Sequence, residues 1–301
     1  MKKKTYLFAL MAMALTLGSC SDNENGIGGE TSKYITVSTS IGNMTRVATD
    51  EKGGQTFEEG DEISVYAWTG DATVAPETRE RVVNNAINKL TNGSWVSTPQ
   101  MLWKNNRDKH YFIGVYPTAA ISDLSAGEYT FDETKQVESD LLVAVNKDGL
   151  SYNVDEQQPV PLTFTHVMAK LVVNHTYKNQ WGAEGPTVDK VAVGNAAKKA
   201  TVNYLTKVVT PSITAKEDFS LPEITENTKY VSVIIPQEDV KQLTIVIGGK
   251  NFVYDNGTPF KLESGKITTV NLEVGRDEIK LGDVKITNWE DGSTFSGEAL
   301  N

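Results

Sequence analysis

The chain has 301 residues, a formal net charge of −10 and a single cysteine. Its length predicts about two domains, and its 39% hydrophobic content is enough to build cores and excludes a disordered chain. With 39 acidic against 29 basic residues it does not suit binding to DNA or RNA, and one cysteine excludes an internal disulfide framework or a cysteine-rich zinc site.

The N-terminus has the pattern of a secretion signal. Three lysines at positions 2–4 precede an apolar run at residues 6–17, which is too short to cross a hydrocarbon core of about 30 Å as a helix. The run ends in Leu17-Gly18-Ser19-Cys20, which resembles the lipobox of bacterial lipoproteins. Residues 1–19 are therefore predicted to be removed and Cys20 to carry acyl chains such as palmitate, although an ordinary signal peptide followed by a stray cysteine is the alternative. Residues 20–32 are polar and rich in glycine, which predicts a flexible tether.

From residue 34 onward, short apolar runs of period two alternate with turn residues, which predicts an all-β protein. Many runs are rich in Val, Ile, Thr and Tyr, which suit a half-buried pleated surface. Gly248-Gly249 between two such runs is typical of a two-residue hairpin. The predicted strands cover residues 34–40, 62–68, 110–116, 141–145, 161–164, 169–177, 188–193, 200–205, 230–235, 243–247, 250–254, 267–274 and 284–289.

One segment is ambiguous, and one break divides the chain. Residues 77–90 carry apolar residues at roughly helical spacing but also three asparagines, so strand and helix both stay open. Pro159 and Pro161 are unfavourable inside a central strand. We therefore predict two β-sandwich domains, residues 33–158 and residues 159–301, each of a size that suits one sandwich.

No constellation of catalytic residues stands out. A G-x-S-x-G elbow is missing, and Gly248-Gly249-Lys250 lacks the earlier glycine of a phosphate-binding loop. His166 and His175 are nine residues apart, so on one continuous strand they would point to opposite faces, which favours structural histidines over a metal site. The acidic residues at 132–133 and 138–140 lack the spacing of a calcium loop. We predict that the protein is not an enzyme and binds no metal ion or cofactor.

Several segments form a pattern when they are taken together. The most specific is Leu162-Thr163-Phe164-Thr165-His166-Val167-Met168-Ala169-Lys170-Leu171. The others are a first strand leading into Met44-Thr45-Arg46, residues 57–66, residues 111–117 with Asp140-Leu141-Leu142 downstream, and residues 265–272 with a closing stretch that ends at Trp289. In this order behind a lipobox they resemble the fimbrillin (Mfa-like) family, the subunits of the type V pilus of Bacteroidota, over most of the chain.

This resemblance implies two tandem transthyretin-like Greek-key β-sandwiches and a structural, adhesive pilus subunit without catalytic activity. In that family the subunit reaches the outer membrane and cell surface as a lipoprotein, and an Arg-specific protease removes the first strand after a Thr-Arg motif. Here Arg46 matches the cleavage position, and Val47 would be the new N-terminus. The open groove then accepts a strand from another fimbrial subunit. The implied partners are the other subunits of a homo- or hetero-polymer, the membrane, and a host or glycan ligand, but not nucleic acid.

The residues make this mechanism physically reasonable. One face of the first strand carries Ile35, Val37, Thr39 and Ile41. Its removal would uncover apolar surface and a row of unpaired backbone groups, a template for strand addition. Residues 284–301 are the candidate donor, with side chains Val284, Ile286, Trp289 and Phe295. The alternative is that this tail pairs within its own domain.

A second function also stays open, that of a surface glycan-binding lipoprotein of a carbohydrate-uptake system. It would use exposed aromatic platforms among Trp68, Trp95, Trp103, Trp181 and Trp289. A tryptophan in a strand is more often part of the packing, which favours the pilus subunit.

Overall fold

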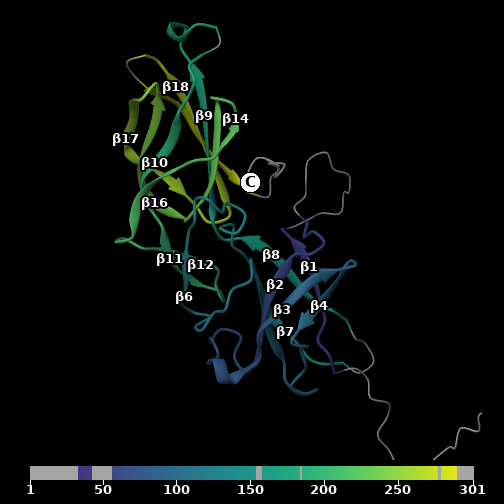
Figure 1. Cartoon of the computed structure of the whole chain (residues 1–301). Helices are drawn as coiled ribbons and strands as arrows, with labels where there is room; N and C mark the ends of the chain where they lie inside the picture. The colour runs from purple at the N-terminus through teal and green to yellow at the C-terminus, as the bar shows by residue number, and fades with distance from the viewer. Residues whose placement is uncertain (1–32, 43–55, 154–157, 184, 277–278, 290–301) are drawn as a thin grey trace, which may run out of the picture. The chain divides into compact units, whose positions relative to one another are not determined.

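A computed structural model describes residues 33–42, 56–153, 158–183, 185–276 and 279–289 (Figure 1). Cys20, Arg46, Val47 and Phe295 lie outside the described residues. Within these ranges the chain forms β-strands and two single-turn 3₁₀ helices, η1 (Thr78–Glu80) and η2 (Asn179–Trp181), which confirms the predicted all-β class. In this part of the chain there is no helix with the length and apolar character needed to cross a membrane.

A seven-stranded sheet occupies the N-terminal half. Its strands lie in the order β1-β8-β7-β5-β2-β3-β4, and β1 runs parallel to β8 while the other neighbours are antiparallel. The strands are β1 (Val37–Ile41), β2 (Glu62–Thr69), β3 (Arg81–Thr91), β4 (Ser94–Thr98), β5 (His110–Tyr116), β7 (Leu142–Leu150) and β8 (Val160–His166). Because β2 and β5 are buried on both faces, their sequences are nearly continuous apolar runs.

The ambiguous segment is strand β3, and a bulge explains its helical spacing. The register with β2 shifts between Val65 and Ala67, so that Val83 and Ala86 lie three residues apart and are both buried. Asn85 sits in the bulge with a φ of 56°, a left-handed conformation that asparagine tolerates better than most residues. The extra residue converts a period of two into a local period of three.

Three further sheets contain the C-terminal strands. A five-stranded sheet has the order β14-β15-β9-β18-β19, a four-stranded sheet β13-β10-β16-β17, and a three-stranded sheet β12-β11-β6. The hairpin predicted at Gly248-Gly249 joins β16 to β17, with positive φ at both glycines. The strands are β6 (Gly127–Thr130), β9 (Ala169–Tyr177), β10 (Lys190–Ala197), β11 (Lys199–Asn203), β12 (Val208–Pro211), β13 (Lys216–Ser220), β14 (Glu223–Thr225), β15 (Lys229–Ile234), β16 (Gln237–Ile247), β17 (Lys250–Leu262), β18 (Lys266–Val274) and β19 (Ile279–Asn288).

The seven-stranded sheet extends beyond residue 158. Strand β8 still pairs with β1 and β7, so the chain leaves the seven-stranded sheet only after His166. Strand β6, from the N-terminal half, pairs with β11. The division into two tandem transthyretin-like sandwiches stays a prediction, and the strand pairing shows that the two halves share one small sheet.

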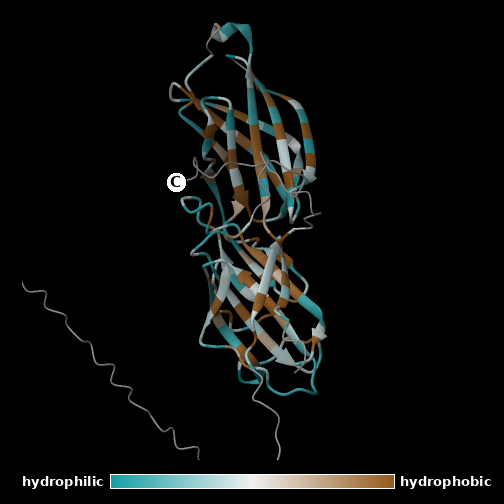
Figure 2. Ribbon diagram, turned by 90° about the vertical axis from the view of Figure 1, so that its right-hand side faces the viewer, coloured by the Kyte–Doolittle hydropathy of each residue, from teal (hydrophilic) through white to brown (hydrophobic). Residues whose placement is uncertain are grey.

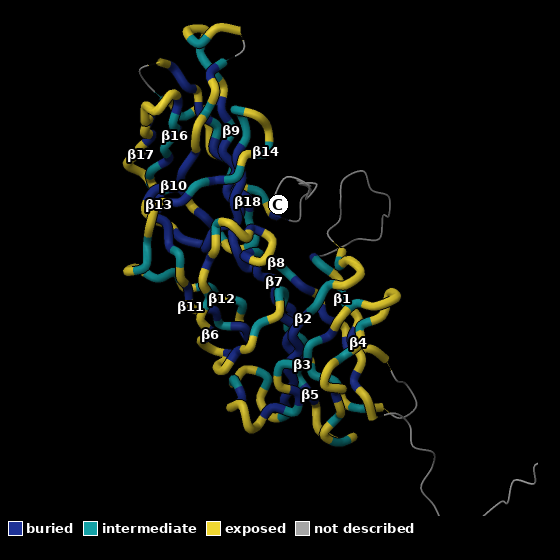
Figure 3. Tube along the Cα trace, viewed as in Figure 1, coloured by how far each residue is buried: buried dark blue, intermediate teal, exposed yellow. Residues whose placement is uncertain are grey.

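Two groups of buried apolar side chains hold these sheets together. The smaller lies on one face of the seven-stranded sheet and includes Ile35 and Val37 of the first strand. The larger runs from the other face of that sheet, at Tyr66 and Ile113, to C-terminal strands such as β16. Apolar and polar residues alternate along many strands (Figure 2), and the buried positions concentrate in the strands rather than in the loops (Figure 3).

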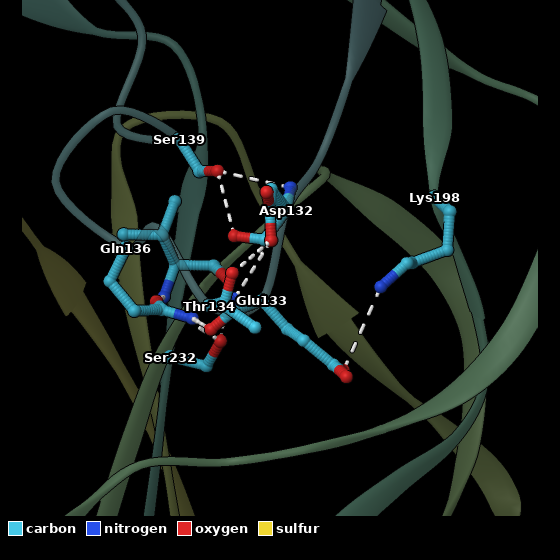
Figure 4. A network of polar contacts seen from close by, with 8 residues as sticks. Asp132, Glu133, Thr134, Gln136, Ser139, Lys198 and Ser232 are labelled. Carbon is cyan, nitrogen blue, oxygen red and sulfur yellow. Dashed lines mark hydrogen bonds and ion pairs between the residues drawn. The ribbon is translucent and has the colours of Figure 1, made fainter.

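The acidic loop at residues 132–140 is structural. The Oδ1 atom of Asp132 accepts hydrogen bonds from the backbone N–H and hydroxyl of Thr134 (Figure 4). The Gln136 side chain is buried and accepts a 2.8 Å hydrogen bond from the backbone N–H of Val233. A loop between β6 and β7 thereby bonds to the part of β15 that extends beyond its short neighbour β14.

We expect Gln136→Leu to lower the free energy of unfolding by about 1–3 kcal/mol, because the backbone N–H of Val233 would lose its partner in a buried site. Glu133→Gln is the matched control, since the Glu133 carboxylate forms only a 3.7 Å ion pair with Lys198 at a partly exposed position. That variant should lose less than about 1 kcal/mol. Urea denaturation of both variants checks the prediction, and equal losses would contradict it.

Candidate functional site

Residues 33–42 form a strap at one edge of the seven-stranded sheet. The side chains of Ile35 and Val37 are 2% and 6% exposed, whereas those of Thr36 and Ser38 are exposed. Further along, Thr39 and Ile41 are half-buried on the inward face. The strap therefore has the alternation that its sequence predicts, with the deepest burial at its beginning.

The strap is hydrogen-bonded on both sides. At its beginning the backbone N–H of Ile35 donates to the carbonyl of Met101 at 2.9 Å, in the segment that follows β4. From there on it pairs with β8, starting with the backbone N–H of Val160, which donates to the carbonyl of Thr36 at 2.8 Å. Because β4 and β8 belong to opposite ends of the seven-stranded sheet, the strap bridges its two ends.

One side chain of the groove reaches the inward face of the strap. The indole N–H of Trp95, on β4, donates a 3.0 Å hydrogen bond to the Thr39 hydroxyl oxygen. Phe57 packs edge-on against Trp95 and against Phe164 of β8, with ring centroids 5.3 Å and 5.1 Å apart. A cavity of about 670 Å³ lies beside this part of the strap and is lined by residues of β1 and β4. The strap is thus tightly packed at Ile35 and loosely packed near Ile41.

A glycine in β5 makes room beneath the strap. A Cβ atom on Gly114 would lie 2.6 Å from the ring of Phe164, which packs in the same core as Ile35 and Val37. The ring therefore occupies the space that any other residue at position 114 would need. This explains a glycine within an otherwise apolar strand.

Of the predicted tail residues, Val284 and Ile286 lie in strand β19 and Trp289 directly follows it, whereas Phe295 lies outside the described residues. This strand pairs along its length with β18. Through residue 288 the chain therefore pairs within its own half, as the alternative prediction expects. Val284 and Ile286 are 39% and 38% exposed although their cross-strand partners, Val270 and Thr268, are fully buried. Trp289 is buried. Donation of this tail stays a prediction.

Trp289 lies in a cluster that sequence reasoning did not assemble. Its ring stacks on His166 at the end of β8, with centroids 4.1 Å apart and an interplanar angle of 7°. The ammonium of Lys170, on β9, lies 4.3 Å from the Trp289 ring centroid, and burial lowers the pKa of Lys170 to about 8. Nδ1 of His166 lies 2.8 Å from a carboxylate oxygen of Asp140. All four residues fall in the segments that carry the family resemblance, which was the available signal.

His166 and His175 occupy different packing environments. His166 and His175 lie on separate strands, β8 and β9, because Val167 and Met168 interrupt the pairing. His175 packs against Tyr230 with ring centroids 5.2 Å apart, and its ring nitrogens make no hydrogen bond of ordinary geometry. Among the described residues no group of three or more His, Cys, Asp or Glu side chains has an arrangement that could hold a metal ion.

His175 should make the fold sensitive to acid. Burial lowers its pKa from 6.5 to about 4, so as the pH falls below about 6.5 the unfolded chain takes up a proton that the folded chain does not. Between pH 7 and 4.5 this term should remove about 2–3 kcal/mol of stability. Urea denaturation of His175→Met at both pH values checks it. The variant should lose about 2–3 kcal/mol less than the native chain, and parallel losses would contradict the prediction.

The tryptophans do not form an exposed platform. All five lie within the described residues, where Trp68 and Trp289 are buried and the other three are half-buried. Each packs on a neighbouring ring, as Trp103 does on Phe112 and Trp181 on Phe252. This arrangement is the packing role that the sequence favoured over glycan contact.

Known proteins resemble this chain over most of its length. The sequence matches the fimbrillin-like family at residues 45–289. A proposed fimbrium subunit of Bacteroides uniformis, Fim1C, is 28% identical over 217 residues, which cover 68% of this chain and 66% of that protein. The chain thus spans just under two thirds of the length of this curated relative.

Solved structures share the fold. A proposed cell adhesion protein of Bacteroides ovatus matches 85% of this chain and 98% of its own, with a TM-score of 0.63 and 18% identity. A proposed cell adhesion protein of Bacteroides uniformis matches 86% of this chain and 100% of its own, with a TM-score of 0.60 and 17% identity. Both solved structures thus share the β fold of this chain. The family match spans residues 45–289, and this protein belongs to the fimbrillin-like family.

Proposed function

We propose that this protein is a fimbrial subunit that is exported as a lipoprotein through Cys20, matured by cleavage after Arg46 and assembled by strand exchange. The observation that supports the exchange is the strap, which bridges the two ends of the seven-stranded sheet and buries Ile35 and Val37. A strand from a neighbouring subunit with the same inward pattern can take the same backbone hydrogen bonds.

Cleavage after Arg46 would make the strap replaceable. Arg46 follows the end of β1 by five residues, so a cut there separates the strap covalently from β2 and all later strands. The strap is then retained by its hydrogen bonds and by two buried apolar side chains, each worth about 1.5–3 kcal/mol. A competing strand that makes the same backbone hydrogen bonds and fills the same two positions can therefore displace it.

The order of the two sites along the chain means that cleavage would release the folded strands from the membrane. Cys20 precedes Arg46, so a cut after Arg46 separates the lipid-bearing cysteine from the folded strands. An uncut chain would stay at the outer membrane as an anchored surface lipoprotein, because two or three acyl chains give stable attachment. A cut chain would be free to enter a fimbrium. The strand it donates in turn is assigned to the C-terminal segment, residues 284–301.

Cleavage of the purified mature chain tests this function. A Cys20→Ser variant removes the lipid, and an Arg-specific protease is added while N-terminal sequencing and size-exclusion chromatography follow the products. We expect a new N-terminus at Val47, followed by oligomers that grow with time. Arg46→Gln is the control and should stay monomeric. Protein that is cut after Arg46 but remains monomeric with its C-terminus intact would contradict the proposal.

A further inference from the structure

The strap meets its two neighbouring strands in different ways. Toward β8 it forms a backbone ladder, from Val37 opposite Val160 to Ile41 opposite Phe164. Toward β4 no strand pairing joins β1 within the described residues, and the indole N–H of Trp95 makes the contact through the Thr39 hydroxyl. Backbone ladders accept almost any sequence, whereas side-chain contacts depend on the residue that they meet. The β4 side is therefore the side of the groove that can distinguish one occupant from another.

The first two inward positions of the strap are tightly packed. Ile35 and Val37 are 2% and 6% exposed and share their core with Phe164. The Phe164 ring is itself held close against Gly114, so this core has no slack for a larger side chain. These two positions suit aliphatic side chains and exclude aromatic ones.

The third inward position is set by the indole N–H of Trp95. This group donates a 3.0 Å hydrogen bond to the Thr39 hydroxyl oxygen, and because an indole N–H can only donate, the group opposite it must accept. Phe57 packs edge-on against the Trp95 ring at 5.3 Å and keeps the ring in place. An occupant with an aliphatic side chain at this position would leave the indole N–H without its partner.

The fourth inward position faces open space. Ile41 is half-buried, and the cavity of about 670 Å³ that it lines extends past Phe57 and Leu90 to Gly93, just before β4. The side chains of Phe57, Leu90 and Trp95 make its walls largely apolar. A larger apolar side chain than isoleucine can enter this space and bury more surface there.

From these four positions we propose that Trp95 is a specificity-determining residue of the groove, which selects an incoming strand with a hydrogen-bond acceptor at the third inward position. The strand that fits best carries two aliphatic residues, then serine, threonine or another short acceptor, then a large apolar or aromatic residue, each separated by one outward residue. A strand with aliphatic side chains at all four positions is disfavoured although it is more hydrophobic. The inference rests on the proposed function and specifies which kind of strand from another subunit the groove takes.

A double-mutant cycle in the uncut chain tests Trp95 without cleavage. Thr39→Val removes the acceptor, and Trp95→Phe keeps an aromatic ring but removes the donor. We expect Thr39→Val to raise the unfolding equilibrium constant, measured by urea denaturation, about fivefold in the native chain and less than about twofold in the Trp95→Phe chain. Ser38→Ala, at an exposed position of the strap, is the control and should have the same small effect in both chains. Equal effects of Thr39→Val in the two chains would overturn the proposal.

Competition between strap peptides tests the selection itself. The Cys20→Ser chain is cut after Arg46 and mixed with an N-terminally labelled peptide of residues 33–42, whose entry into the groove is followed by fluorescence polarisation. Unlabelled peptides that differ at one position then compete with it. If the native peptide does not enter the cut chain at all, the replaceable strap of the proposed function is contradicted, and a positive double-mutant cycle would leave Trp95 as a stabilising contact of the strap without a role in selection.

The peptides should rank by inward position. We expect the Thr39→Val peptide to compete about fivefold less well than the native peptide, the Val37→Phe peptide about tenfold less well, and the Ile41→Phe peptide at least equally well. In the Trp95→Phe chain the native and Thr39→Val peptides should compete equally. Equal competition by these two peptides in the chain that keeps Trp95 would overturn the proposal.

Discussion

Ile35→Ala should lower the free energy of unfolding of the uncut chain by about 2–5 kcal/mol, the usual cost of truncating a buried isoleucine. Ile35 is 2% exposed and lies where the strap is hydrogen-bonded to the segment after β4. The loss of its side chain leaves a cavity at the closure of the sheet. Urea denaturation measures the change.

Thr36→Ala is the matched control, because the side chain of Thr36 is exposed. This substitution should lower the free energy of unfolding by less than about 0.5 kcal/mol. After cleavage at Arg46, the Ile35→Ala strap should also dissociate faster than the native one. Equal stability of the two variants would show that the strap contributes little to the sheet, which would contradict the arrangement described above.

Trp289→Ala should cost about 3–5 kcal/mol, because it empties the largest buried position at the end of β19 and leaves the Lys170 cation without its aromatic partner. Val284→Ala is the control on the same strand. Val284 is 39% exposed, so its substitution should lower the free energy of unfolding by about 1 kcal/mol or less. Thermal denaturation of both variants distinguishes them, and a Trp289→Ala chain as stable as Val284→Ala would contradict the anchoring of β19.

Local patterns predicted the strands but not their partners. The period-two runs located β9 and β18, whose buried residues alternate or are continuous as expected. The bulge at Asn85 disguised β3, since it changes the spacing of inward residues from two to three. Short polar strands such as β6 and β13 have few apolar residues and acquire their pairing from distant strands, so no local signal marks them.

In the candidate site, too, the local sequence predicts burial but not the contacts between distant residues. The alternation at Ile35 and Val37 correctly predicted which face of the first strand is buried, because that pattern depends only on strand geometry. The strap also forms a hydrogen bond to Met101, and its Thr39 hydroxyl accepts the indole N–H of Trp95. Both contacts depend on how the sheet bends, which the local sequence does not show. Likewise, Asp140 and Trp289 meet at His166 through tertiary packing alone, although each lies in a segment that drew notice.

The two sites are joined by one strand. Strand β8 pairs with the strap through Phe164 and, two residues later, presents His166 to Trp289. An incoming strand would therefore bind beside β8, and the end of β8 also contacts Trp289, which follows β19. In this arrangement the acceptor groove can change its occupant while β19 keeps its place.

If the strap is a replaceable occupant of the groove, it must leave the sheet when the cut subunit assembles. A fluorophore on Lys33 of the Cys20→Ser chain reports whether the fragment ending at Arg46 stays bound. We expect that after the cut the labelled fragment is released in proportion to subunits entering oligomers, and remains bound while the protein is monomeric. Oligomers that retain the labelled fragment would contradict it.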